Sequence, residues 1–382
     1  MMCGYLLARA GVRVTVLEKH ADFYRDFRGD TVHPSTMQIL DELGLLARFL
    51  ERPHNRLDRA EIDYNGRHLT IGDLSHLKMP APFIAMMPQW KFLDFLRGEA
   101  AKLPTFSLRM LTEAVAFRHA DGRIGGVCLA DGTVVDAGLV ICCDGRASLA
   151  RQELPLEDLG APIDVFWFSI PKSGRGSSLR SVVKGRRLLV MIDRGDYWQC
   201  AFVIAKGSAE TIKARGIAAF VADLRIAAPD LTGIDEALPN WDKIQLLSVS
   251  LDRLGEWSRP GLLAIGDAAH AMSPVGGIGI NLAVQDAVAT ANIIATALVC
   301  GDDVDALLVK VQTRRLLPTR LVQGAQRRAH EGFLKPLIAA GDSTARAPLA
   351  LRLLDRFPIL RRIPGHFIGH GVRQEHVRSP TA

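Results

Sequence analysis

The chain has 382 residues, of which 48% are apolar and 23% charged, a composition typical of a globular protein of two or three domains. The net charge of +6 is small for this length, and no Lys/Arg run is long enough for a nucleic-acid-binding arm. The six cysteines lack CxxC spacing, which argues against a disulfide framework or a metal site and favours reduced thiols in a cytoplasmic protein.

No stretch approaches the ~20 apolar residues of a membrane span. The longest candidate, 287–300, is too short and carries polar side chains. The first residues lack the basic leader of a signal peptide. We therefore expect no integral membrane segment.

The first elements along the chain are a helix, a strand and a second helix. Residues 1–10 form an amphipathic pattern that Gly11 would end, and 12–17 form a β-branched run typical of a strand. Residues 34–43 carry an apolar stripe, with Ser35 as the predicted cap. Helix and strand thus alternate from the start.

The middle of the chain is richer in strands. Asn65-Gly66 predicts a hairpin within 61–71, and residues 139–143 are a continuous apolar strand of the kind found in the middle of a parallel sheet. The remaining predicted elements are a helix at 90–101, short strands over 106–140, strands at 188–192, 197–204 and 262–265, helices at 209–226 and 281–299, and a helical region from 304 to the end. This order predicts an α/β core with an inserted, more β-rich region.

The first motif is part of a dinucleotide-binding βαβ unit, in which a strand, a Gly-rich turn, a helix and a second strand ending in an acid follow one another. The opening helix, the next strand and Glu18 match its later parts, and Gly4 and Gly11 have the spacing of the extended flavoprotein fingerprint. The first strand and the G-x-G-x-x-G turn are missing, so we expect the chain to begin just after the phosphate-binding turn. The alternative is a plain helix–strand pair of an unrelated domain.

The second motif follows the buried strand at 139–143. Asp144, Gly145, Ser148 and Arg151 would place a carboxylate and a cation at the carboxyl edge of a sheet, where ligands bind. The alternative is a simple Asp-Gly turn with an arginine facing solvent.

The third motif is the most specific. The strand 262–265 ends in Gly266-Asp267, whose carboxylate can accept hydrogen bonds from sugar-like hydroxyls. A glycine loop with free backbone N–H groups then leads into a helix N-terminus, which suits an atom carrying negative charge. This loop comprises Pro274, Gly276, Gly277, Gly279, Ile280 and Asn281.

Together these motifs resemble the FAD-dependent aromatic hydroxylases of the p-hydroxybenzoate hydroxylase-like family, over about residues 1–330. The resemblance implies a Rossmann-like FAD-binding domain of the glutathione-reductase type with an inserted, mainly β substrate domain. The implied boundaries are 1–60, 88–155 and 252–330 for the FAD-binding domain, 61–87 and 156–251 for the substrate domain, and 331–382 for a C-terminal helical segment.

The resemblance also implies site residues. Asp144, Gly145 and Arg151 would bind both FAD and NAD(P)H, and Asp267 would hold the ribitol. The loop from Pro274 to Asn281 would lie beside the isoalloxazine ring, with Pro274 and Gly277 in the environment of the reacting ring. Glu18 would bind the adenosine ribose, and Arg28 and Gln89 would contact the cofactor. No acid or base is assigned, since His33 and His270 fit a structural role better.

The chemistry implied by the family is hydroxylation of an aromatic or similar small molecule. NADH or NADPH reduces FAD, and reduced flavin reacts with O2 to a C4a-hydroperoxide that the substrate attacks. The substrate would lie between the flavin and the inserted sheet, where Tyr197, Trp198 and Gln199 are candidates for its pocket, with core packing as the alternative. A homodimer is compatible with the sequence.

Three other functions fit parts of the pattern. A flavin-dependent halogenase would carry Trp-x-Trp-x-Ile-Pro, of which residues 166–171 keep only the last two fixed positions. A flavin reductase or dehydrogenase would use the same cofactor without inserting oxygen. A truncated, non-catalytic fragment would bind FAD weakly.

Overall fold

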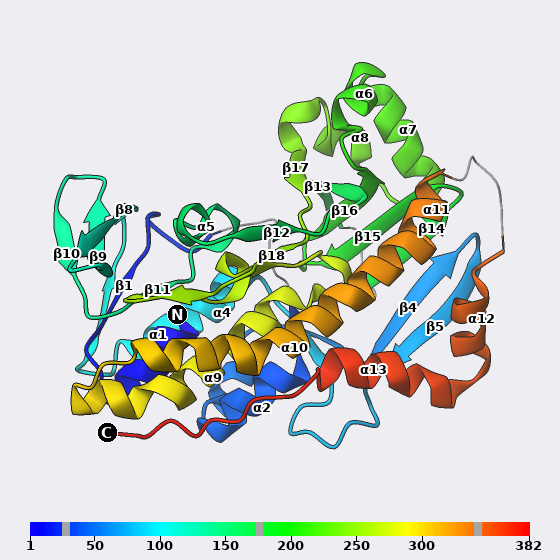
Figure 1. Ribbon diagram of the computed structural model, residues 1–382. Coiled ribbons are helices and arrows are strands. Elements are labelled where there is room, and N and C mark those ends of the chain that lie inside the picture. Colours follow the sequence, from blue (N-terminus) through cyan, green and yellow to red (C-terminus); the bar gives the residue numbers. More distant parts are fainter. Residues whose placement is uncertain (25–30, 173–178, 340–345) are drawn as a thin grey trace.

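A computed structural model describes residues 1–24, 31–172, 179–339 and 346–382 (Figure 1). The chain opens with helix α1 (Met2–Arg9), which ends at Gly11 with a φ of +95°, and strand β1 (Val14–Leu17), as predicted. Strand β1 pairs in parallel with β7 (Phe106–Arg109). Helix α4 (Gln89–Ala100) packs against α1.

A second parallel pair lies nearby. Strand β11 (Val140–Cys142) pairs with β20 (Leu262–Ala264), which pairs on its other side with β19 (Ser258–Arg259). The prediction of a strand in the middle of a sheet was wrong for β11. Among the described residues it has one ladder partner, and Val140 and Ile141 are only half-buried.

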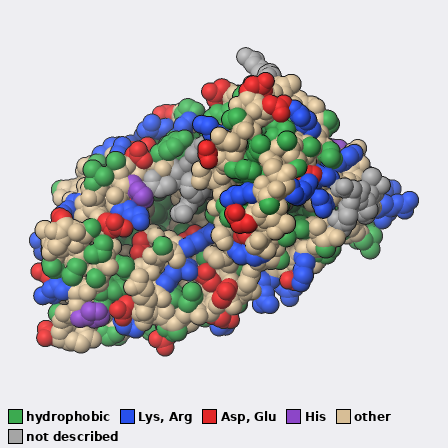
Figure 2. Space-filling model, turned by 90° about the horizontal axis from the view of Figure 1, so that it is seen from above, with side chains coloured by type: hydrophobic (Ala, Val, Ile, Leu, Met, Phe, Trp, Pro, Cys, Tyr) green, Lys and Arg blue, Asp and Glu red, His purple; other side chains and the backbone are tan. Residues whose placement is uncertain are grey.

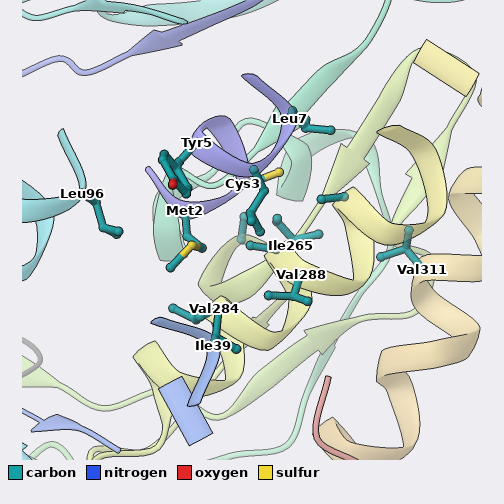
Figure 3. Packing of buried hydrophobic residues seen from close by; sticks show 14 of the residues in the cluster. Met2, Cys3, Tyr5, Leu7, Ile39, Leu96, Ile265, Val284, Val288 and Val311 are labelled. Atoms are coloured by element: carbon teal, nitrogen blue, oxygen red, sulfur yellow. The ribbon is translucent and has the colours of Figure 1, made fainter. Parts of the chain in front are cut away.

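The main core joins these strands to two long helices, α9 (Gly279–Cys300) and α10 (Asp305–Ala329). Figure 3 shows Cys3 of α1, Ile265 after β20 and Val288 of α9 gathered in one apolar cluster. By length and composition the helical stretch Val275–Cys300 could cross a membrane, but 61% of its most apolar window is buried inside the protein. A buried core helix passes the same test, so this stretch is weak evidence for a span.

The inserted sheet has seven strands, in which the hairpin of β4 and β5 joins the five later strands through the pairing of β4 with β14. Its order is β17 (Gln245–Ser248), β13 (Ile163–Pro171), β16 (Tyr197–Ala205), β15 (Arg187–Asp193), β14 (Leu179–Lys184), β4 (Arg59–Tyr64) and β5 (Arg67–Asp73). The predicted Asn65-Gly66 hairpin joins β4 to β5.

One face of this sheet is covered by short helices, α6 (Ala209–Ala214), α7 (Ile217–Ala227) and α8 (Ile234–Ala237). The single predicted helix over 209–226 was wrong, because Gly216 breaks it with a φ of +86°. Phe220 of α7 contacts the rings of Phe166, Phe168 and Phe202, with centroids 5.3–5.7 Å apart.

Three smaller sheets complete the fold. They are formed by β2 (Thr31–Val32), β6 (Ile84–Met86) and β3 (Asn55–Leu57); by β8 (Ala114–Ala120), β9 (Arg123–Leu129) and β10 (Val134–Asp136); and by β12 (Leu156–Asp158), β18 (Asp252–Leu254) and β21 (His270–Ala271). Two helices follow β2, namely α2 (Pro34–Glu42) and α3 (Leu46–Leu50). Ser35 was wrong as the cap of α2, because His33 takes that position and Pro34 starts the helix.

The described part of the C-terminal region is mainly helical, and its last helix ends at residue 369. After α10 come a π-helical turn (His330–Leu334), α11 (Lys335–Ala339), α12 (Leu349–Arg356), a 3-10 turn (Pro358–Arg361) and α13 (Arg362–Gly369). The prediction of helix up to the last residue was wrong, since 371–382 form no helix and instead hydrogen-bond to other elements, for example from Ala382 N to Arg9 O. Figure 2 shows acidic and basic side chains interspersed on the face seen from above.

Candidate flavin site

The second and third motifs meet at one edge of a sheet. Because β11 and β20 are parallel neighbours, the turns that follow them lie side by side. Arg151 links the two turns: its guanidinium donates to the backbone oxygen of Asp267 at 2.7 Å and of Ala268 at 3.2 Å. It also pairs with the buried Asp252 at 2.8 Å. Arg151 thus fixes the backbone of the Gly-Asp turn.

Asp144 and Gly145 shape the turn after β11. A carboxylate oxygen of Asp144 accepts from Leu149 N at 3.1 Å, and Gly145 has a φ of +82°. The Asp144 carboxylate therefore stabilises its own turn and lies at the protein surface beside the third motif.

The Asp267 carboxylate lies against the N-terminus of α9. A Cβ on Gly279, the first residue of that helix, would be 3.8 Å from Asp267 Oδ1. The Asp267 side chain keeps 41% of its surface exposed, 3.9 Å from the Arg146 guanidinium. Gly266 allows the turn to approach α9 so closely, since its φ is +59° and a Cβ there would lie 2.9 Å from Ala283 Cβ.

The glycine loop before α9 is tied to β2. Gly276 and Gly277 both have positive φ, and a Cβ on Gly277 would overlap the Thr31 hydroxyl. That hydroxyl donates to Gly277 O at 2.8 Å, and the buried Asn281 amide donates to Gly277 O and Thr31 O at 3.1 Å each. The Asn281 side-chain oxygen accepts from His33 N at 2.8 Å. Thus the Asn281 side chain cross-links the loop to β2, while Ile280 packs against the main core.

Helix α10 holds the loop from the other side. Gln326 accepts from Ser273 N and donates to the carbonyls of Ser273 and Val275, at 2.9–3.1 Å. The buried His330, at the start of the π-helical turn, contacts the Ser273 hydroxyl through Nε2 at 2.8 Å. Burial lowers the pKa of His330, which keeps it neutral near neutral pH. Pro274 is thereby flanked by two fixed residues.

A buried charged network lies behind the Gly-Asp turn. Asp286 of α9 accepts from Gly266 N at 3.1 Å, from His270 Nε2 at 2.6 Å and from Arg315 Nε at 2.8 Å. Arg315 also contacts Glu375 of the C-terminal segment at 3.2 Å. Burial opposes ionisation of Asp286, but the His270 and Arg315 charges keep its pKa below the usual value.

Glu18 and Gln89, two other predicted cofactor residues, belong to other elements than the two turns. Glu18 directly follows β1 and accepts from His20 N at 2.9 Å, and Gln89 is the first residue of α4. Arg28 lies outside the described residues. His33 is fully buried and contacts Ile368 O of α13 at 3.0 Å, and burial lowers its pKa to about 4. It therefore has the structural role that the sequence favoured.

The predicted substrate residues alternate between the two faces of the inserted sheet. Trp198 is buried on the face covered by α7, which argues against a place for it in the pocket. Tyr197 and Gln199 have the opposite orientation, on the face where Ala201 and Val203 pack in one cluster with Val275 of the glycine loop. Only this face turns toward the third motif.

Gln199 and Trp167 of neighbouring strands each have a buried polar atom without a hydrogen-bond partner among the described residues. Gln199 Nε2 donates to Phe168 O at 3.2 Å, but its Oε1 has no donor, and the indole N–H of Trp167 has no acceptor. Trp167 pairs with Ala201, so it shares the face of Gln199. Such atoms in a folded protein call for a ligand or water.

Sequence reasoning missed the residues that hold the site from behind. Gln326, Arg315 and Glu375 lie far from any motif in the sequence. Asp286 gave one usable signal, since a carboxylate inside an otherwise apolar helix needs a buried partner.

Comparison with known proteins agrees with this arrangement. Residues 1–325 match the model of a family described as FAD binding domain. Over 381 residues the chain is 30% identical to 6-methylpretetramide 4-monooxygenase of Streptomyces rimosus, covering 98% of this chain and 90% of that protein. It is 28% identical to rifampicin monooxygenase of Streptomyces venezuelae, of which it spans 58%.

Solved structures show the same fold. The p-nitrophenol 4-monooxygenase PnpA of Pseudomonas putida superposes with a TM-score of 0.75 at 19% identity, covering 98% of this chain and 96% of that one. PqsL of Pseudomonas aeruginosa, a probable FAD-dependent monooxygenase, gives 0.73 at 21% identity, covering 88% and 94%. The family match over most of the chain and the relative matched almost end to end agree, and the chain belongs to the FAD-binding-domain family of FAD-dependent monooxygenases.

Proposed function

We propose that this protein is an NAD(P)H-dependent FAD monooxygenase that hydroxylates an aromatic or similar small molecule. The observation that carries the proposal is the meeting of the Asp267 carboxylate, the Gly276–Gly277 loop and the N-terminus of α9 at one place. A half-exposed carboxylate suits the hydroxyls of a ribitol chain. Glycines without Cβ atoms let a flat ring approach the backbone.

Bound FAD would supply hydride acceptance from the nicotinamide and, once reduced, activation of O2. The chain's own residues hold and tune the site. The N–H groups at the start of α9 and the helix dipole favour negative charge at the loop. Gln326, Ser273 and His330 fix Pro274, and the apolar sheet face around Ala201 keeps water out.

We further propose that the flavin-binding sheet is a Rossmann-like sheet of the glutathione-reductase type that needs one more strand and a Gly-rich turn. In its support, β1 and β11 each have one parallel neighbour and one edge without a ladder partner among the described residues. Unpaired parallel edges inside a core are unfavourable. Fusing the first strand and Gly-rich turn of a relative to residue 1 should increase FAD retention on gel filtration. Equal retention by the two proteins would refute the missing strand.

For the substrate, we propose contacts with Gln199 Oε1 and the Trp167 indole N–H. A planar ring bearing a hydroxyl and a neighbouring carbonyl would satisfy both atoms, since one accepts and the other donates. Relatives named for aromatic substrates, including an anhydrotetracycline monooxygenase of Streptomyces rimosus at 26% identity, are consistent with this class.

The fold alone does not decide the reaction, because the Diels-Alderase PyrE3 superposes with a TM-score of 0.73 and the dialkyldecalin synthase of Streptomyces rugosporus is 24% identical. The test is therefore oxygen consumption. Purified FAD-loaded protein, with NADH or NADPH, is assayed against a panel of hydroxylated aromatic ketones. Substrate-stimulated O2 uptake with a product heavier by one oxygen atom supports the monooxygenase. Reduction without such a product favours a reductase, and protein that stays colourless after FAD addition favours a non-catalytic role.

A further inference from the structure

A dense apolar patch lies on the outer side of α12, the 3-10 turn and α13. Five of the sixteen large hydrophobic side chains that are exposed in the described part of the chain fall within residues 349–363. They are Leu349, Leu353, Phe357, Ile359 and Ile363, with 40–67% of their surface exposed. Exposed apolar groups gathered in this way mark an interaction surface.

The patch is the side of α12 that does not pack against the rest of the protein. Helices α12 and α13 both contact β5, the edge strand of the inserted sheet, and Leu351 of α12 faces inward. Leu349, Leu353 and Phe357 follow one another at intervals of four residues on the outer side, and α12 is strongly amphipathic. The outer row therefore has no role in the packing of the described core.

Positive charge surrounds the patch. Residues 346–373 contain six arginines and a single acid, Asp355. Arg352, Arg356 and Arg362 are exposed among the apolar side chains. Asp355 points inward instead, where it accepts from Thr70 N at 3.2 Å and pairs with Arg67 at 3.4 Å. Nothing acidic in this stretch balances the outer arginines.

This combination selects among partners. In a symmetric dimer built on the patch, each arginine would face arginines of the second copy without an intervening acid. Nucleic acid would match the charge but leave Leu353, Phe357 and Ile359 in water. A bilayer rich in acidic lipids matches both properties, because apolar side chains enter the acyl boundary while arginines reach the phosphates.

We propose that α12, the 3-10 turn and α13 form a peripheral docking surface for anionic membranes. The surface lies at the opposite end of the molecule from hairpin β8–β9–β10 (Figure 1). Docking there would hold the protein at a bilayer without inserting any helix across it. This inference stands independently of the proposed reaction.

The test is sedimentation with vesicles, using the full chain. Vesicles of phosphatidylcholine alone are compared with vesicles in which a third of the lipid is phosphatidylglycerol. We expect binding to the acidic vesicles that weakens with salt. Neutralising Arg352, Arg356 and Arg362 to Gln should lower the partition coefficient by roughly fivefold per residue. The triple variant L353S/F357S/I359S should lower it by at least about tenfold.

The matched control is V115S/V134S, which alters two side chains 48–50% exposed in the distant hairpin and should bind like the parent. Thermal unfolding verifies that each variant is folded. Absence of binding to acidic vesicles, or equal binding by L353S/F357S/I359S, would overturn the proposal. So would a parent dimer that this variant converts to monomer in sedimentation equilibrium, since the occupant would then be a second copy.

Discussion

The flavin side of the molecule and the inserted sheet are held together in different ways. Behind the Gly-Asp turn, Asp286, Arg315, His270 and Glu375 form a charged network with 0–5% exposed surface. Behind the inserted sheet, Phe220 and its neighbours form an aromatic cluster. Hydrogen bonds and ion pairs have preferred directions, so such a network can fix the positions of backbone atoms that face a polar ligand. Apolar packing has no preferred direction, and it only needs to keep the sheet rigid.

Substitutions in the charged network and in the aromatic cluster should change the stability of the protein to different extents. A charged network tolerates little change, because removing one member leaves another buried without a partner. An aromatic cluster tolerates changes that keep volume and polarity.

The largest expected effect is at Arg315. Arg315→Ala leaves Asp286 and Glu375 buried without their shared cation, so we expect a loss of about 3–5 kcal/mol in the free energy of unfolding. Arg315→Lys should restore less than half of the lost free energy of unfolding, because one ammonium group cannot hydrogen-bond to both carboxylates in this geometry. Urea unfolding measures this. The control is Arg320→Ala, an exposed arginine of the same helix α10, which should cost about 0.5 kcal/mol or less. Equal losses at the two arginines would refute the network.

Acid should weaken the flavin side through His33. The pKa of His33 is about 4 in the folded state and about 6.5 in the unfolded state. Between these pH values His33 therefore binds a proton in the unfolded chain but stays neutral in the folded chain. Stability should therefore fall as the pH drops from about 6.5 to 4, by roughly 3 kcal/mol in total. Urea unfolding across this range gives the slope. His33→Asn should flatten it, leaving a remainder from His330, and an unchanged slope would contradict the assignment.

At the glycine loop, Gly277→Ala should cost about 2 kcal/mol and weaken FAD binding, because the new Cβ overlaps Thr31 and the φ of +61° is strained. Gly301→Ala is the matched control, with a φ of +77° and nothing within 4 Å of the added Cβ. It should cost about 1 kcal/mol. Adding Thr31→Ala should recover part of the Gly277→Ala loss. Additive losses in this double-mutant cycle would show that the two residues do not interact.

The smallest effect is expected in the aromatic cluster. Phe220→Leu keeps an apolar side chain of similar volume, so the loss should be no more than about 1.5 kcal/mol. FAD affinity, measured by fluorescence titration, should not change. If Phe220→Leu cost as much as Arg315→Lys, the contrast between the two regions would disappear.

Local patterns in the sequence were sufficient for much of the fold. The Asn65-Gly66 hairpin, helix α1 ending at Gly11, and the helix after the glycine loop follow from turn chemistry and apolar periodicity, which act over a few residues. The family was predictable for the same reason, since the Gly-Asp and Asp-Gly motifs are contiguous. Errors arose where a single residue overrode the pattern, as Gly216 did in the helix over 209–226.

The sequence by itself determined the family, the cofactor and the local shape of each motif, because these depend on neighbouring residues. Only the tertiary structure decided which face of the inserted sheet Gln199 occupies relative to the glycine loop, and which distant side chains complete the site. Asp286, Arg315 and Glu375 meet through the packing of α9, α10 and the C-terminal segment. Contacts between residues so far apart leave no periodic trace in the chain, since burial and pairing arise only when the helices pack.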